Sequence, residues 1–295
     1  MSMMIDLPKS IRLEPHHQLQ RLTIATPAAS GAIYLHGAQV TAWQPAGHLP
    51  VIWLSRCSHW DPAKPIRGGV PICFPWFGPN AADPQAPMHG FARTARWNLE
   101  SATTDSSGTA VVTLSLHSTP ETRKLWPFDF RARFTAVFAA SLSMSLTVTN
   151  TSPRPCSFEQ ALHTYFTVGN VKDIKIHGLG GTQYIDKTSQ FKIKSQDNKP
   201  IRITGETDRV YLDTPAAVTI EDPSMKRKIT IDKSGSQTTV VWNPWIAKAK
   251  AMADFGHEEW PGMVCIETVN AAKNKIVLPG GGTYTMTARV NVTSM

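Results

Sequence analysis

The stretch Leu142-Ser143-Met144-Ser145-Leu146-Thr147-Val148-Thr149 is the clearest guide to the architecture, because apolar and polar residues alternate along it without a break. A period of two is typical of a strand with one buried and one solvent-facing side. Long stretches with helical spacing are nearly absent, and Gly, Pro, Asn, Asp and Ser turns separate the strand-like runs. Similar runs, rich in threonine and valine, recur at 111–116, 130–138, 174–176, 218–220, 229–231, 238–242 and 284–292. The sequence therefore predicts an all-β fold with few short helices, built as an antiparallel sandwich or barrel.

Length and composition favour a single globular domain over residues 1–295. The chain is 41% hydrophobic, which is enough for a large core, and no linker or internal repeat interrupts it. Lys plus Arg number 30 against 22 for Asp plus Glu, so the formal net charge is +8. Such a balance suits nucleic acid, an anionic membrane surface or a phosphorylated substrate, or simply a solvated basic surface. The densest basic cluster, 226–228, reads as a turn between strands.

The sequence predicts a cytoplasmic protein. The stretch from Met1 to Pro8 lacks the basic and apolar regions of a signal peptide, and no apolar run reaches the roughly 18 residues of a membrane helix. Four widely separated cysteines form no CxxC pair and show no metal-ligand spacing, so we expect free thiols and no metal site.

Two arginine-bearing segments lie close together, Arg-Gly-Gly-Val-Pro at 67–71 and His-Gly-Phe-Ala-Arg at 89–93. The planar guanidinium matches an oxyanion bidentately, and neighbouring glycines let a ligand approach the backbone. The proline-rich segment 62–87 is too long for a simple turn, and long loops in compact domains usually line a site. Alternatively, either arginine forms an internal salt bridge with an acidic loop residue such as Asp83. The polar segment 181–209 is expected to be a long functional loop carrying a short hairpin.

Two further segments each place a titratable group in an apolar, strand-like run: His163 in Ala-Leu-His-Thr-Tyr-Phe and Glu267 in Val-Cys-Ile-Glu-Thr. Burying such groups is costly unless they are paired or used. A lone histidine in this setting is more often a satisfied core residue, and a lone strand glutamate is more often solvent-facing. Under a period of two, however, Glu267 shares its face with Cys265 and Val269, so apolar neighbours surround it.

Taken in order, five segments make the chain resemble the glucose-6-phosphate 1-epimerase family, the hexose-6-phosphate mutarotases of the galactose mutarotase-like superfamily. They are Arg-Gly-Gly-Val-Pro-Ile-Cys-Phe-Pro-Trp-Phe-Gly-Pro, His-Gly-Phe-Ala-Arg, Ala-Leu-His-Thr-Tyr-Phe, Thr-Asp-Arg-Val-Tyr and Ile-Glu-Thr, between residues 67 and 269. The resemblance implies a large β-supersandwich that needs no cofactor. It also implies interconversion of the α and β anomers of a hexose 6-phosphate.

The resemblance also implies roles for individual residues. His163 and Glu267 match the catalytic acid and base, and modest tuning of their ordinary pKa values would suit both to neutral pH. Other matched positions are the phosphate-contacting arginines Arg67 and Arg93, and His89 and Asp208, which contact sugar hydroxyls in relatives. Asp208 read alone would be a turn-capping residue. Met88 stands where some relatives carry glutamine, and the aromatic residues Trp76, Phe77, Trp242 and Trp245 are candidates to wall the cleft.

Two other functions remain open from the sequence. One is an aldose 1-epimerase acting on neutral sugars such as galactose. The other is a carbohydrate-binding or sensing protein that keeps the cleft without the chemistry. Neither a nucleic-acid partner nor a membrane is expected, because basic and aromatic residues are not interleaved on one element. Without heptads or a long apolar edge, we expect a monomer.

Overall fold

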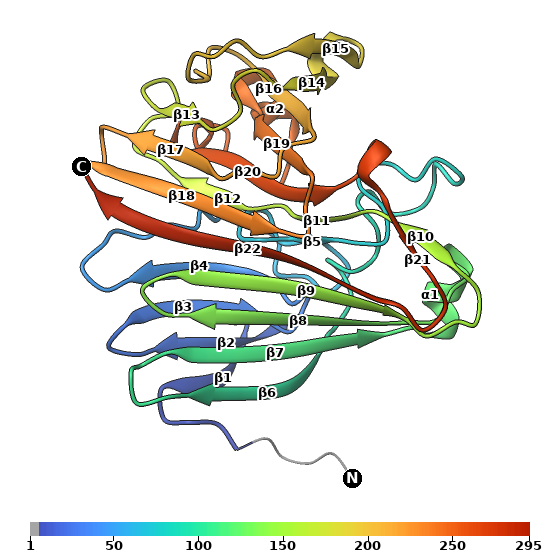
Figure 1. The fold of residues 1–295 in the computed structure, drawn as a ribbon. Coiled ribbons are helices and arrows are strands. Elements are labelled where there is room, and N and C mark those ends of the chain that lie inside the picture. Colours follow the sequence, from blue (N-terminus) through green and yellow to red (C-terminus); the bar gives the residue numbers. More distant parts are fainter. Residues whose placement is uncertain (1–5) are drawn as a thin grey trace.

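A computed structural model describes residues 6–295 and has the all-β architecture that the alternating pattern predicts (Figure 1). The absence of a signal peptide was predicted partly from residues 1–5, which lie outside the described residues. Within residues 6–295, no helix is both long enough and apolar enough to cross a membrane.

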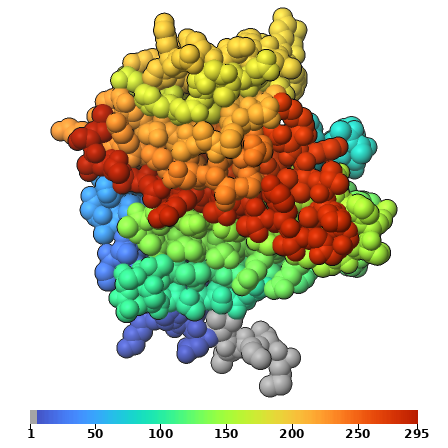
Figure 2. Space-filling view, viewed as in Figure 1, coloured from blue at the N-terminus to red at the C-terminus, as the bar shows by residue number. Residues whose placement is uncertain are grey.

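An eight-stranded antiparallel sheet contains all the strands predicted from strict alternation except the run at 238–242. Its strand order is β13-β17-β18-β22-β9-β8-β7-β6. The strand β22 pairs with β9 along eight residues of each, although the two are far apart in sequence, and they lie side by side in Figures 1 and 2. The strands are β6 (Asn98–Thr104), β7 (Ala110–His117), β8 (Phe130–Phe138), β9 (Leu142–Asn150), β13 (Lys175–His177), β17 (Val218–Asp222), β18 (Arg227–Ser234) and β22 (Thr283–Ser294).

A second antiparallel sheet, with the order β15-β14-β16-β19-β20-β11-β5, contains the central strand β20, whose residues are all buried. The short strand β12 also pairs with β20, next to β11. Buried residues of both large sheets belong to one continuous hydrophobic core. The strands are β5 (Ile72–Cys73), β11 (Gln160–Leu162), β12 (Tyr165–Thr167), β14 (Gln183–Asp186), β15 (Lys192–Ser195), β16 (Thr207–Leu212), β19 (Thr238–Asn243) and β20 (Met263–Asn270).

The amino-terminal part forms a four-stranded sheet, in the order β1-β2-β3-β4, that the alternation did not reveal. In β1 only the first residue is fully buried, so the strand carries almost no apolar period. The other elements are β1 (Ile11–His16), β2 (Leu19–Ala25), β3 (Ala29–Tyr34), β4 (Val40–Pro45), the pair β10 (Cys156–Phe158) and β21 (Ile276–Leu278), the helices α1 (Pro120–Leu125) and α2 (Trp245–Ala251), and 3₁₀ turns at Lys187–Ser189, Trp260–Gly262 and Ala272–Asn274.

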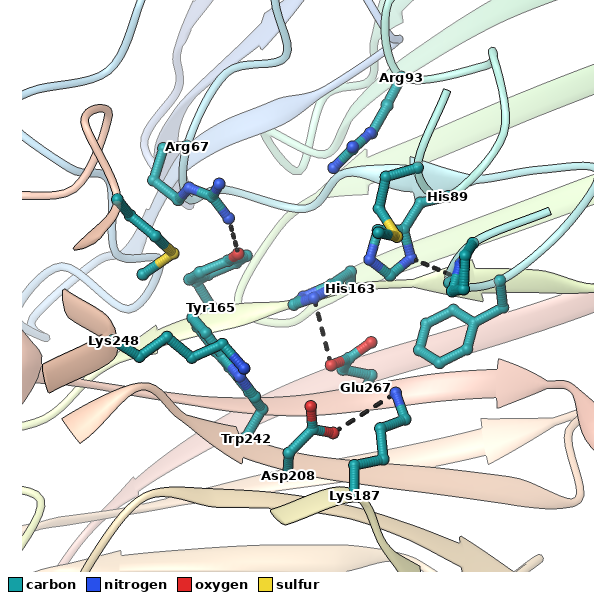
Figure 3. Close-up of a pocket in the computed structure, with 15 residues that line it drawn as sticks. Arg67, His89, Arg93, His163, Tyr165, Lys187, Asp208, Trp242, Lys248 and Glu267 are labelled. Atoms are coloured by element: carbon teal, nitrogen blue, oxygen red, sulfur yellow. Dashed lines mark hydrogen bonds and ion pairs between the residues drawn. The ribbon is translucent and has the colours of Figure 1, made fainter. Parts of the chain in front are cut away.

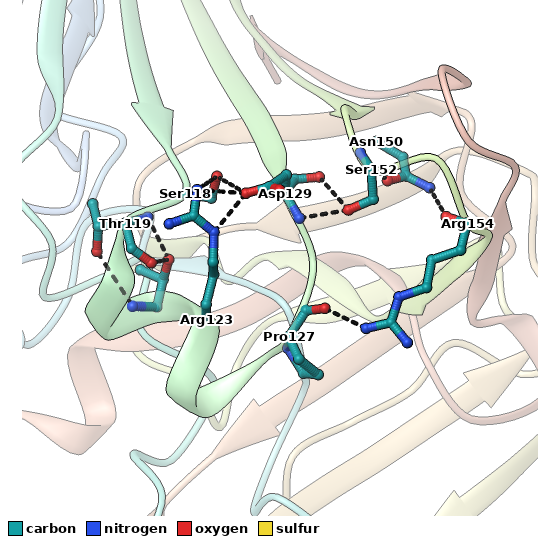
Figure 4. A network of polar contacts seen from close by, with 9 residues as sticks. Ser118, Thr119, Arg123, Pro127, Asp129, Asn150, Ser152 and Arg154 are labelled. Carbon is teal, nitrogen blue, oxygen red and sulfur yellow. Dashed lines mark hydrogen bonds and ion pairs between the residues drawn. The ribbon is translucent and has the colours of Figure 1, made fainter.

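A polar network joins the ends of β7, β8 and β9 (Figure 4). The Asp129 carboxylate accepts a hydrogen bond from Ser118 Oγ at 2.8 Å, and the Asp129 backbone N–H donates to Ser152 Oγ at 2.6 Å. The buried Asn150 amide donates to the carbonyls of Arg154, Leu278 and Pro279. These bonds fix the path of the chain from β9 to β10 and β11. They therefore help to position the residues that follow β11.

Candidate active site

A cavity of about 380 Å³ lies against the second large sheet, and all six residues that the sequence singled out line it (Figure 3). Segments that are distant in the chain meet there: the loop before β5, the loop after it, the junction of β11 and β12, and the strands β16, β19 and β20. Both long loops contribute, as predicted, because 62–87 supplies Arg67 and 181–209 forms the β14–β15 hairpin that supplies Lys187. The lining residues are Arg67, Phe77, Gly78, Pro79, Met88, His89, Arg93, His163, Tyr165, Lys187, Asp208, Trp242, Lys248, Met252 and Glu267.

Strand register explains why residues from four strands reach the same cavity. Tyr165 on β12 lies opposite Cys265 on β20, Cys265 lies opposite Trp242 on β19, and Trp242 lies opposite Asp208 on β16. Directly opposed residues point to the same face of a sheet. Glu267 follows Cys265 by two residues, so it projects from the same face as this row.

His163 and Glu267 contact each other on the floor of the cavity. His163 occupies the bend between β11 and β12, and its Nε2 lies 3.3 Å from Glu267 Oε1. The two side chains are only 12% and 1% exposed. His163 Nδ1 and Glu267 Oε2 are also buried, without a hydrogen-bond partner among the described residues. Since buried polar atoms are rarely left unsatisfied, this is a place where a polar ligand would find partners.

Burial shifts the pKa values of this pair in opposite directions, and more than the modest tuning expected from the sequence. Desolvation raises the pKa of the Glu267 carboxyl well above its ordinary value. Desolvation, reinforced by His89, Arg67 and Arg93, pushes the pKa of His163 well below its ordinary value. Burial thus favours a neutral carboxyl with a neutral imidazole over the carboxylate and imidazolium that the sequence suggested, and either state holds one transferable proton.

Arg67 is held on two sides. Its Nε and Nη2 each lie 3.1 Å from Asp254 Oδ2, and its Nη1 donates to the Tyr165 hydroxyl at 3.1 Å. Burial opposes the charged form, but Tyr165 and Asp254 carry the pKa of Arg67 above its ordinary value. An internal salt bridge of this arginine therefore exists, but the predicted partner is wrong. Asp83 instead accepts from the Gln85 backbone N–H at 2.9 Å.

Arg93, by contrast, makes no hydrogen bond or ion pair with any side chain in residues 6–295 (Figure 3). Burial lowers its pKa, and the charge of Arg67 lowers it further. An arginine still carries its charge after such a shift, because its ordinary pKa is above 12. The cavity thus contains one arginine neutralised by a carboxylate and one whose charge is uncompensated.

His89 is a neutral hydrogen-bond donor to the cavity. Its backbone has a φ of 64°, and Gly90 follows with a φ of 76°, where a Cβ would collide with the Phe74 carbonyl. Burial, together with the cations Arg93, Lys187 and Arg67, lowers the pKa of His89 to about 3. The Gly78 N–H donates to His89 Nδ1 at 3.1 Å, so the ring proton must sit on Nε2.

Asp208 lies within β16 and does not cap a turn. Lys187 Nζ, from the β14–β15 hairpin, is 3.4 Å from Asp208 Oδ1 and lies 5.0 Å from the centre of the Phe77 ring. Burial raises the pKa of Asp208, although Lys187 and Lys248 partly offset that effect. This carboxyl thus stands at the opposite side of the His163–Glu267 pair from the two arginines (Figure 3).

The aromatic candidates divide into two groups. Phe77 and Trp242 line the cavity, as does Met88, whose side chain is half exposed. Trp76 packs its ring edge-on against Phe91 in the core, and Trp245 packs against Trp260.

Seven residues of the site were not predicted as site residues: Gly78, Pro79, Tyr165, Lys187, Lys248, Met252 and Asp254. Tyr165 had a usable signal, because it follows His163 by two residues in the same motif. Asp254 had none, since its contact with Arg67 joins positions 187 residues apart. Lysines such as Lys187, in a polar segment, look like any solvated surface lysine.

The chain is similar to known proteins in both sequence and fold. The family model described as "Aldose 1-epimerase" matches residues 20–291. A relative from Cenchrus ciliaris named "Putative glucose-6-phosphate 1-epimerase" is 36% identical over 256 residues, which cover 84% of this chain and 77% of the relative. A relative of the same name from Escherichia coli K12 is 34% identical over 260 residues, covering 88% and 86%. The crystal structure of a "putative mutarotase" from Salmonella typhimurium superposes with a TM-score of 0.92 and 29% identity, covering 99% of this chain and 96% of that one.

Proposed function

Because this chain belongs to the aldose 1-epimerase family, we propose that it interconverts the α and β anomers of glucose 6-phosphate and of similar aldohexose 6-phosphates. The observation that carries the proposal is one cavity in which the buried His163–Glu267 pair and two arginines face the same space. A general acid and base suit hemiacetal opening, and the arginines suit a phosphate.

The one-proton pair supplies both proton transfers of ring opening. One member accepts the proton of the anomeric hydroxyl while the other donates its proton to the ring oxygen. The O1–H and C1–O5 bonds break, and the C1–O1 double bond and the O5–H bond form. The pair still holds one proton, now on the other member. After rotation about C1–C2, the 5-hydroxyl attacks the opposite carbonyl face, and the transfers reverse.

Following the family resemblance, Glu267 serves as the base and His163 as the acid. The 3.3 Å contact between them supports this, because negative charge on Glu267 would stabilise a proton on His163 Nε2. No other described carboxylate is in contact with that histidine. When one proton moves from Glu267 to His163, the pair passes from the neutral state that burial favours to the carboxylate–imidazolium state that reacts.

The position of the arginines supports a phosphate at C6. In an aldohexose 6-phosphate, C6 is bonded to C5, which carries the ring oxygen. If His163 donates to that oxygen, the phosphate extends away from Glu267, towards Arg67 and Arg93 (Figure 3). Arg93 brings an uncompensated charge, and a neutral sugar would leave that charge without a partner.

His89 and Asp208 complete the proposed site as sugar-binding residues. The Nε2–H of His89 can donate to a sugar oxygen, and Asp208 can accept from hydroxyls on the Glu267 side. We also propose that the protein acts as a monomer in the cytoplasm. The four free cysteines, of which three are buried, fit a reducing compartment.

The test is anomer exchange followed by proton NMR on equilibrated glucose 6-phosphate and on equilibrated glucose. Strong acceleration for the phosphate and weak acceleration for glucose is the expected result. Arg93→Ala should reduce kcat/KM for glucose 6-phosphate by roughly ten- to a hundredfold, with little effect on glucose. Arg133→Ala is the matched control, because it removes an exposed arginine paired with Glu100 on the sheet that contains β6 to β9, which we call the outer sheet.

Two outcomes would count against the proposal. Acceleration of glucose alone would indicate a neutral-sugar epimerase and assign both arginines a structural role. Binding of the phosphate without any acceleration would indicate a carbohydrate-sensing protein.

A further inference from the structure

Tyr165 stacks on His163 and contacts Arg67, and the proposed function leaves it unused. It is the first residue of β12 and is buried, yet it lines the cavity. Its ring is stacked between two others: His163 at 4.9 Å and 12°, and Trp53 at 5.7 Å and 18°. The orientation of the ring, and therefore of its hydroxyl, is fixed by these two neighbours.

The Tyr165 hydroxyl accepts a hydrogen bond, but its own proton has no acceptor among the described residues. Tyr165 Oη accepts a hydrogen bond from Arg67 Nη1 at 3.1 Å. A guanidinium has no acceptor, so the hydroxyl proton cannot be returned to Arg67. Within residues 6–295 this hydroxyl donates to no protein acceptor. Burial also raises the pKa of Tyr165, so the hydroxyl keeps its proton.

Asp254 makes the arrangement rigid. Its Oδ2 engages Nε and Nη2 of Arg67, which leaves Nη1 directed at Tyr165. The guanidinium has five N–H groups, and the three contacts with Asp254 and Tyr165 leave two of them free. The free donors of Arg67 and the proton of Tyr165 therefore belong to one connected group at the wall of the cavity.

We propose that Tyr165 is a specificity-determining residue whose hydroxyl donates a hydrogen bond to the substrate's phosphate, alongside Arg67. This inference rests on the proposed function, in which the phosphate lies next to the arginines. A phosphate oxygen accepts several hydrogen bonds and can bridge the hydroxyl and a free guanidinium N–H. Because Asp254 neutralises Arg67, these two residues together carry little net charge. The Tyr165 hydroxyl adds a directed hydrogen-bond donor beside them.

The variant Tyr165→Phe tests this directly, because it removes one oxygen and keeps the ring that stacks on His163. Its KM for glucose 6-phosphate should rise roughly ten- to a hundredfold, as expected for the loss of a hydrogen bond to a charged group. The kcat should change by less than about threefold, and kcat/KM for glucose should stay the same. Tyr34→Phe is the matched control: that hydroxyl is also buried and bonded, to His16 Nδ1 at 2.8 Å, on the amino-terminal sheet.

Direct binding of inorganic phosphate, measured by calorimetry, separates this inference from the proposed function. The dissociation constant should rise in Tyr165→Phe and not in Tyr34→Phe, whether or not the protein turns over glucose 6-phosphate. An unchanged dissociation constant and KM in Tyr165→Phe would overturn the inference. So would an equal loss of kcat on both substrates, which would mean that the hydroxyl only positions His163. Failure of the wild-type protein to bind phosphate would overturn both proposals.

Discussion

Replacing Glu267 with glutamine is the most informative perturbation of the proposed chemistry. The two side chains have nearly the same volume, and the glutamine amide can still contact His163 Nε2, 3.3 Å away in the wild-type protein. An amide cannot take up or release a proton in the reaction. Each general acid–base transfer typically contributes about 10²–10⁴-fold, and the two members of this pair act as one unit. We expect kcat to fall by about 10³-fold or more, or about 4 kcal/mol of barrier.

The same substitution should leave phosphate binding nearly unchanged and should not destabilise the fold. Burial raises the pKa of the Glu267 carboxyl well above its ordinary value and so favours the neutral form, which glutamine resembles. We expect the variant to be at least as stable as the wild-type protein near neutral pH, and the dissociation constant for inorganic phosphate to stay within about threefold. Glu100→Gln, which removes a carboxylate paired with Arg131 and Arg133 on the outer sheet, is the matched control.

The stability of this variant also has a predictable pH dependence. The folded-state pKa of Glu267 is raised above the unfolded value, which is about 4.3, so between these values the native state binds the extra proton. This contribution to wild-type stability is fully present below the unfolded pKa. It is lost as the pH rises through that window towards the folded pKa. The glutamine variant lacks this proton and should gain stability relative to the wild type with rising pH.

The assay is anomer exchange by NMR for kcat, calorimetry for phosphate binding, and denaturant unfolding at several pH values. Full activity in Glu267→Gln would refute the assignment of the base. A large loss of stability at neutral pH would show that the carboxyl is ionised in the folded protein, contrary to the effect of burial on its pKa.

Three further predictions concern the surroundings of the pair. Because burial raises the pKa of Glu267 and lowers that of His163, the pH profile of kcat should not show limbs at the ordinary glutamate and histidine values of about 4.3 and 6.5, while kcat/KM should fall below about pH 6 as the substrate phosphate gains a proton; limbs of kcat at those two ordinary values would contradict the shifts. Asp254→Asn keeps an acceptor for Arg67 but removes a compensating charge, so inorganic phosphate should bind roughly three- to tenfold tighter by calorimetry, and weaker binding would argue against charge compensation. Gly90→Ala should destabilise the fold by about 3 kcal/mol or more in denaturant unfolding, because its Cβ would collide with the Phe74 carbonyl at a positive φ; a change under about 1 kcal/mol would refute this.

Much of the outer sheet could be predicted from local pattern, and the reason is physical. The strands β8 and β9 bury every second side chain from end to end, and this regular burial leaves a period of two in the sequence. In β20 both faces are buried, so the apolar run revealed a strand but not which residues it would bring together. In the amino-terminal sheet, β1 buries only its first residue fully, so that strand leaves no period of two in the sequence.

For the site, the sequence was sufficient for the identity of the main candidates, because Arg67, His89, Arg93, His163, Asp208 and Glu267 stand in recognisable motifs. Which atoms meet was decided by strand register and by loops. These bring Asp254 to Arg67 and Lys187 to Asp208, and they leave the hydroxyl proton of Tyr165 without a protein acceptor. The tertiary structure also decides which protonation states of Glu267 and His163 are favoured. A carboxyl and an imidazole have ordinary pKa values in any unfolded chain, and only their removal from water at the cavity floor raises the pKa of Glu267 and lowers that of His163.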